Sequence, residues 1–165
     1  QWAWKPNDTM KPLKQCILTL LQTVGGDGNL LFNVGPMPDG RIEARQVKRL
    51  KEIGVWLTHH GDGVYGTRGG PFKPGTWGAS TCLNDKIYLY VMNWPENGPL
   101  HLPAIAPTIR STTTRTAGMA KVTQTDTHVA ISLDPADRDE IASSLELTVD
   151  AKALDIQPKK VGSNQ

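Results

Sequence analysis

The chain has 165 residues, a formal net charge of +2 and 21% charged residues. This charge is too small to favour nucleic-acid binding, and the Lys and Arg residues form no stripe interleaved with aromatic residues. No stretch approaches the roughly 18 consecutive apolar residues of a membrane-spanning helix, so the composition excludes a membrane-spanning protein.

The chain begins with Gln-Trp-Ala-Trp, which we expect to be the end of a strand, stopped by Pro6. An amphipathic helix is expected from Met10 to Val24, because apolar residues recur there at helical intervals. Those residues are Leu13, Ile17, Leu20, Leu21 and Val24. The pair Gly25-Gly26 then ends the helix.

The next segment, Leu30 to Val34, is a short apolar run between glycines, interrupted by Asn33. Such a run is typical of a strand buried on both faces, as in a parallel sheet. The prolines that follow and the pair Asp39-Gly40 predict a turn. A second helix is expected from Glu43 to His59, with histidines in its last turn and Gly61 after it.

After this helix the composition changes to glycine and proline, and then to strand patterns of period two. The clearest strand is Lys86 to Met92, preceded by the hairpin pair Asn84-Asp85. Further short strands are expected at 100–102, 129–133 and 145–149, whereas 111–116 is a connection or a solvated edge strand. The expected domains are 1–66, α/β, and 67–165, an antiparallel β-sandwich.

Several linked motifs resemble one enzyme family: Asn29-Leu-Leu-Phe-Asn-Val-Gly-Pro, then Asp39-Gly40, then Gly54-Val-Trp-Leu and Val64-Tyr-Gly-Thr-Arg. In this order they resemble the end of the catalytic barrel of α-L-fucosidases, glycoside hydrolase family 29. The resemblance implies a fold in which the C-terminal end of a (β/α)8 TIM-like barrel is followed by the β-sandwich. Because 165 residues fall short of the roughly 250 of a complete barrel, we expect a C-terminal piece of a longer protein.

Enzymes of this family resemble retaining glycosidases, which use two carboxyl groups about 5 Å apart. The resemblance implies that both carboxylates lie upstream, so no residue of this chain is expected to be catalytic and the chain alone should be inactive. It also implies a fucosylated glycan as the substrate, with no metal and no cofactor. It leaves the oligomeric state open and suggests a secreted, periplasmic or lysosomal protein.

Trp2 is the candidate substrate-binding residue, because the matching family position lines the sugar pocket and an aromatic face buries the methyl group of fucose. The surrounding motif departs from the family, however, and both Trp2 and Trp4 have the alternative of packing at the barrel rim. Asn33 is the candidate supporting residue, since a buried amide needs hydrogen-bond partners in a neighbouring loop or in its own turn. Asp27 and Asp39 are expected to be turn residues.

Cys16 and Cys82 neither demand nor forbid a disulfide, although two buried free thiols are the simpler expectation, and no His/Cys cluster has zinc-ligand spacing. The alternative function is a non-catalytic carbohydrate-binding or structural β-sandwich module. Exposed aromatic residues among Trp77, Tyr90 and Trp94 would favour sugar binding, and buried ones a structural role.

Overall fold

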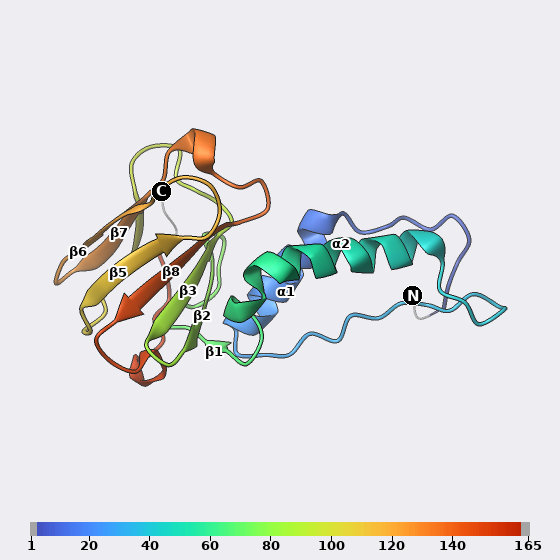
Figure 1. The fold of residues 1–165 in the computed structure, drawn as a ribbon, viewed down its shortest axis with the longest axis horizontal. Coiled ribbons are helices and arrows are strands. Elements are labelled where there is room, and N and C mark those ends of the chain that lie inside the picture. Colours follow the sequence, from blue (N-terminus) through green and yellow to red (C-terminus); the bar gives the residue numbers. More distant parts are fainter. Residues whose placement is uncertain (1–2, 163–165) are drawn as a thin grey trace.

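The computed structural model describes residues 3–162, and the structural statements below concern those residues. Helix α1 spans Leu13–Gly25 and helix α2 spans Ala44–His60, so both expected helices are confirmed. The two helices lie side by side and extend away from the sheets on one side of the molecule (Figure 1). The segment between the helices starts beside strand β1 (Arg68–Gly69), where Asp27 contacts both residues, and then runs away from the sheets.

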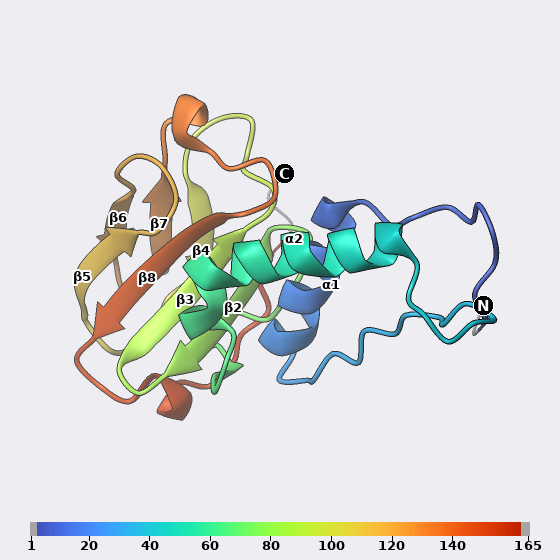
Figure 2. The same cartoon turned by 45° about the vertical axis from the view of Figure 1, so that its right-hand side comes forward.

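The rest of the chain forms eight strands in two antiparallel sheets (Figure 2). The strands are β1 (Arg68–Gly69), β2 (Gly78–Leu83), β3 (Lys86–Val91), β4 (Leu100–Pro103), β5 (Ile109–Thr114), β6 (Lys121–Gln124), β7 (His128–Ser132) and β8 (Ser143–Val149). The five-stranded sheet has the order β1-β2-β3-β8-β5, and the three-stranded sheet has the order β4-β7-β6. Short 3₁₀ turns lie at Gly61–Gly63, Pro135–Asp137 and Ala153–Asp155.

The four strands expected from alternation are confirmed as β3, β4, β7 and β8, and the Thr-rich stretch is edge strand β5. Sequence patterns missed β1, β2 and β6. Strand β2 reads Gly-Ala-Ser-Thr-Cys-Leu, whose small and hydroxyl side chains give no apolar alternation. It is a strand because it is paired on both sides, with β1 and with β3.

The hairpin between β2 and β3 has the two-residue turn predicted from Asn84-Asp85. Leu83 pairs with Lys86, and Asn84 has a positive φ of 55°. Asn and Asp tolerate this left-handed conformation better than other non-glycine residues, which accounts for an asparagine at position 84.

Strand β3 is buried on both faces, and its two faces contact different layers. Ile87, Leu89 and Val91 belong to the core between the two sheets. Tyr88 and Tyr90 belong to a second core, which lies between the five-stranded sheet and the helices. Alternation along a strand sends successive side chains to opposite faces, so one strand contributes to both cores.

Helix α1 approaches strand β2 closely at Gly25. A Cβ atom on Gly25 would lie 2.8 Å from the Cβ of Ala79 and 3.3 Å from the carbonyl oxygen of Ser80. Only a residue without a side chain allows this contact, which brings the end of α1 onto the sheet.

The expected buried strand at Leu30–Val34 is not found as a strand. The segment is extended without strand pairing, and Leu31 is 84% exposed. The N-terminal residues 3 and 4 are also outside any strand. A strand exists only when neighbouring strands pair with it, and the described residues supply no such neighbour to this apolar run.

Both cysteines are buried and free, which confirms the simpler expectation. Within residues 3–162, no helix has the length and apolar character needed to cross a membrane.

Candidate functional site

The turn after the extended segment is the first part of the site expected from the sequence. An isolated bridge joins Pro36 to Ile42, and the backbone N–H of Met37 donates to the carbonyl of Arg41 at 2.7 Å. Gly40 has a φ of +82°, which a glycine adopts without strain. The predicted turn at Asp39-Gly40 is therefore confirmed.

The Asp39 side chain forms hydrogen bonds within this turn. Its carboxylate accepts from the backbone N–H of Arg41 at 3.0 Å and from the Arg41 guanidinium at 2.8 Å. The Arg41 side chain is the main cause that lowers the pKa of Asp39. An exposed carboxylate held ionised by its own neighbour suits a turn residue and not a proton donor.

Trp4 lies against the start of the same turn. A Cβ atom on Gly35 would lie 2.8 Å from the backbone nitrogen of Trp4 and 3.1 Å from its Cα. The absence of a side chain at Gly35 thus lets the N-terminal segment run directly beside the turn.

Glu43 fixes the Trp4 side chain from the other direction. The indole Nε1 of Trp4 donates to Oε2 of Glu43 at 2.9 Å, and Glu43 also forms an ion pair with Arg45. Arg45 in turn donates to the carbonyl oxygen of Asp8 at 3.3 Å. The hydrogen bond from Arg45 and, after it, the one from Trp4 lower the pKa of Glu43. No sequence pattern predicts this contact, because Trp4 and Glu43 are 39 positions apart.

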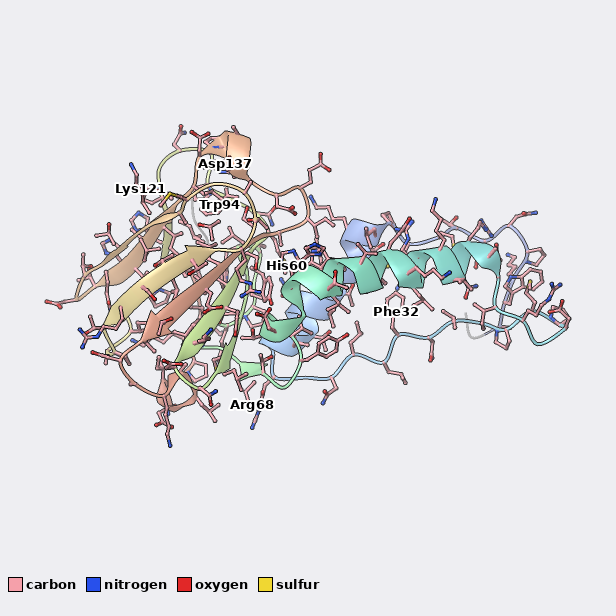
Figure 3. All side chains as sticks on the ribbon, in the orientation of Figure 1. Phe32, His60, Arg68, Trp94, Lys121 and Asp137 are labelled. Carbon is pink, nitrogen blue, oxygen red and sulfur yellow. The ribbon has the colours of Figure 1, made fainter. Side chains whose placement is uncertain are left out.

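The structure describes only one of the two site residues predicted from the sequence, Trp2 and Asn33. Trp2 lies outside the described residues. Asn33 is exposed, so the buried amide that the apolar run suggested is not present in this chain. Trp4 is half-buried beside Gly35 and Glu43, and Phe32 lies on the extended segment away from the sheets (Figure 3).

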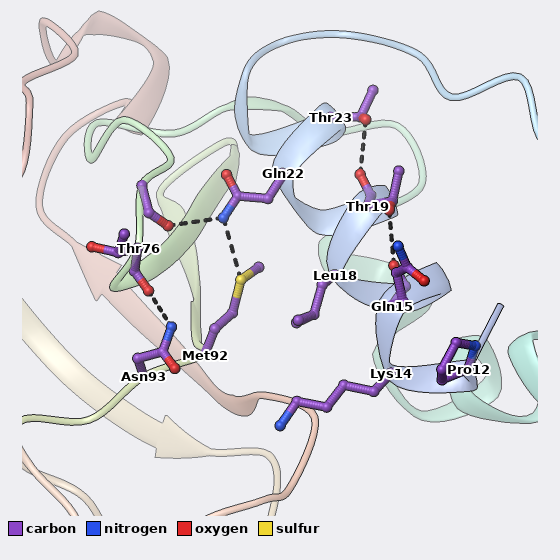
Figure 4. A pocket seen from close by; sticks show the side chains of 11 residues that line it. Pro12, Lys14, Gln15, Leu18, Thr19, Gln22, Thr23, Thr76, Met92 and Asn93 are labelled. Carbon is purple, nitrogen blue, oxygen red and sulfur yellow. Dashed lines mark hydrogen bonds between the residues drawn. The ribbon is translucent and has the colours of Figure 1, made fainter.

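A groove of about 720 Å³ lies elsewhere, between α1 and the sheet (Figure 4). The Gln22 amide donates to the carbonyl of Gly75 at 2.9 Å and approaches the sulfur of Met92 at 3.3 Å. The residues that line the groove are Pro12, Lys14, Gln15, Leu18, Thr19, Gln22, Thr23, Gly75, Thr76, Met92 and Asn93. This lining contains no carboxylate and no histidine, so the groove lacks the pair of carboxyl groups that a retaining glycosidase uses.

Three carboxylates where the helical segment meets the sheets, those of Asp27, Asp62 and Glu146, are paired with arginines. Asp27, in the turn after α1, accepts from two nitrogens of Arg68 at 2.8 and 2.6 Å, which holds the end of α1 to β1. Arg115 bridges Asp62 at 2.8 Å and Glu146 at 2.9 Å. These pairs connect the helical segment to the sheets, which is a structural role that the sequence did not reveal for Asp27.

His60 is the least satisfied polar group at the junction of α2 and the sheets (Figure 3). The residue is 8% exposed, and its buried Nδ1 lacks a hydrogen-bond partner among the described residues. The ring of Trp56 stacks on it at 4.5 Å. Burial lowers the pKa of His60, an effect that nearby Asp139 opposes and Arg115 reinforces.

This burial predicts acid sensitivity of the fold. The unfolded chain takes up a proton at His60 near the ordinary pKa of about 6.5, whereas the folded chain does so only at lower pH. The free energy of unfolding should therefore fall as pH drops below about 6.5, by at most about 1.4 kcal/mol per pH unit from this group. Urea unfolding at pH 7.5, 6.5 and 5.5 measures the effect.

A His60→Gln variant is the control, because glutamine does not titrate. Its stability should change less between pH 7.5 and 5.5 than that of the parent chain. Equal pH dependence of the two chains would show that another group controls the acid response.

Within 3–162, no three residues among His, Cys, Asp and Glu gather in a group that could hold a metal ion.

Comparison with known proteins places these features in context. A family profile described as Alpha-L-fucosidase matches residues 1–62. The chain is 34% identical over 119 residues to an alpha-L-fucosidase of Branchiostoma floridae, covering 65% of this chain and 26% of that protein. It is 34% identical over 105 residues to tissue alpha-L-fucosidase of Homo sapiens, covering 60% of this chain and 22% of that protein. The chain thus spans about a quarter of the length of these relatives.

Solved structures agree over a longer stretch. An alpha-L-fucosidase of glycoside hydrolase family 29 from Bacteroides thetaiotaomicron, described with a trapped covalent intermediate, matches with a TM-score of 0.79 at 25% identity. That match covers 92% of this chain and 36% of the solved one. An alpha-L-fucosidase isoenzyme from Paenibacillus thiaminolyticus shares the fold, with a TM-score of 0.78 at 23% identity over 90% of this chain and 37% of the other.

Proposed function

We propose that the chain is part of a retaining alpha-L-fucosidase, because residues 1–62 match the alpha-L-fucosidase family profile and the sequence is 34% identical to an alpha-L-fucosidase over 119 residues. The enzyme releases terminal alpha-linked L-fucose from glycans. The observation that carries the proposal is similarity to one class of enzyme in both sequence and fold, the latter over 92% of the chain. A trapped covalent intermediate in the Bacteroides thetaiotaomicron enzyme supports retention, because retaining glycosidases pass through a glycosyl-enzyme.

The chain is proposed to contain parts of two domains, as the resemblance to fucosidases implies. Residues 1–66 form the last strand–helix units of a (β/α)8 catalytic barrel, and residues 67–165 form a C-terminal β-sandwich domain. Exposed apolar side chains support the barrel assignment: Leu31 is 84% exposed and Val55 on α2 is 63% exposed. Large exposed apolar surface is typical of a face that another part of a protein covers. The upstream barrel strands would supply the partners that Leu30–Val34 lacks here.

Within this proposal the chain supports the active site and does not perform the chemistry. The nucleophile and the acid/base carboxylate lie in the upstream part of the barrel. Trp2 contacts the sugar, and Asn33 tightens the turn that begins at Gly35 once neighbouring strands bury it. No residue of this chain is assigned as catalytic, and the carboxylates of Asp27, Asp39 and Glu43 are each engaged by an arginine.

The alternative, a carbohydrate-binding sandwich, needs an exposed aromatic platform. Trp77 is 4% exposed and Tyr90 is 1% exposed. Trp94 donates to the Ser143 hydroxyl at 3.1 Å, and the guanidinium of Arg138 covers its ring at 5.0 Å. These aromatic residues are engaged in packing, which favours a supporting domain over a sugar-binding one.

Hydrolysis of an aryl α-L-fucoside tests the proposed function. This 165-residue chain should show no activity above background, whereas a protein that joins it to the upstream barrel should hydrolyse the substrate. An Asp39→Asn change in the longer protein should leave the rate within about twofold, because loss of an acid/base group would cost about 10² to 10⁴. Activity in the short chain would show that one of its own carboxylates is catalytic.

A further inference from the structure

The segment that carries Trp4 is held by contacts that come from a single stretch of the chain, 35–45. The backbone of Trp4 lies directly against Gly35. A Cβ atom on Gly35 would be 2.8 Å from the Trp4 nitrogen, so no side chain fits there. Glu43 accepts the indole N–H at 2.9 Å. Backbone and side chain of Trp4 are therefore both fixed, by two residues on either side of the Asp39-Gly40 turn.

Glu43 is itself held in place. Its side chain is 17% exposed, and its second carboxylate oxygen pairs with Arg45. Arg45 also reaches the carbonyl oxygen of Asp8 at 3.3 Å, which ties the far end of the N-terminal segment to the first turn of α2. A hydrogen bond to an ionised carboxylate is roughly twice as strong as one between neutral groups. The arrangement gives Trp4 one fixed orientation.

The effect of these contacts on sugar binding depends on Trp2, the residue proposed to contact the sugar. Trp2 lies outside the described residues, but it is two positions from Trp4, at most about 7 Å along extended backbone. A tryptophan that contacts a sugar binds well only when its ring is held in place before the sugar arrives.

We propose that Glu43 is a positioning residue of the fucose site: by holding the Trp4 indole beside Gly35, it sets the place of the N-terminal segment that contacts the sugar. This inference rests on the proposed fucosidase function. It assigns to Glu43 an effect on sugar binding and none on the bond-breaking step.

The first measurement concerns the contact and does not depend on activity. In a ¹H–¹⁵N spectrum of the 165-residue chain, a Trp4→Phe change identifies the Trp4 indole N–H signal. That signal should shift as Glu43 titrates at acid pH, and the shift should be lost in Glu43→Gln. Asp39→Asn is the matched control, because Asp39 pairs with Arg41 in the same turn. A titration that persists in Glu43→Gln would overturn the contact.

The second measurement uses the longer protein that joins this chain to the upstream barrel. Glu43→Ala should raise KM for an aryl α-L-fucoside about tenfold, the order expected for loss of one charge-assisted hydrogen bond, with kcat within about twofold. Glu43→Gln keeps an acceptor oxygen for the indole and should recover part of the loss. Asp39→Asn should leave KM unchanged.

The outcomes separate the two proposals. A parent protein without fucosidase activity would overturn the proposed function, and the inference about Glu43 with it. An active parent whose KM is unchanged in Glu43→Ala would overturn the inference alone. A fall in kcat with unchanged KM would also contradict it, because that result places Glu43 in the chemical step.

Discussion

A Tyr90→Ala variant should lose about 3–5 kcal/mol of the free energy of unfolding, the cost of removing a large aromatic side chain from a core. Tyr90 is 1% exposed and lies in the core between the five-stranded sheet and the helices. Its ring contacts that of Trp56 on α2, with centroids 6.2 Å apart. The change leaves a cavity where the two layers meet, so we expect the helices to separate from the sheet first.

Urea unfolding followed by circular dichroism measures this loss, and Tyr90→Phe is its control. The phenylalanine keeps the ring and removes only the hydroxyl, whose hydrogen bond to the carbonyl oxygen of His60 is long, at 3.4 Å. Tyr90→Phe should therefore cost no more than about 1 kcal/mol. Similar losses in both variants would show that the hydroxyl, and not the packing of the ring, holds the layers together.

A Gly25→Ala variant should lose about 1–3 kcal/mol, although alanine is the better helix former. The added Cβ would lie 2.8 Å from the Cβ of Ala79, so α1 must move away from β2. That movement would also disturb the Asp27 turn, which pairs with Arg68 on β1 at 2.6 Å. The midpoint of urea unfolding reports the loss.

Gly54→Ala in α2 is the matched control for this variant. A Cβ atom there has no neighbour within 4 Å, so alanine should raise stability by about 0.5–1 kcal/mol through helix propensity alone. The two glycine changes should therefore have opposite signs. Stabilisation by both would show that the close approach of α1 to β2 relaxes without cost.

The candidate site was only partly accessible from the sequence. The Asp39-Gly40 turn follows from local chemistry, and the structure confirms it. The contact of Trp4 with Glu43 joins residues 39 positions apart, and that of Asp27 with Arg68 joins residues 41 positions apart. No local pattern encodes such pairs, because the partners meet only after the intervening helices have packed.

Local sequence patterns predict the elements that depend on neighbouring residues: both helices from their apolar period, the Asn84-Asp85 hairpin from its turn residues, and strand β3 from alternation. Which face of β3 meets the helices and which meets the second sheet depends on how the layers pack in three dimensions. The tertiary structure also shows that Leu30–Val34, apolar enough for a buried strand, lies extended and unpaired among the described residues. Helices and tight turns satisfy their hydrogen bonds locally, whereas a strand needs partners from elsewhere, and burial needs a covering layer.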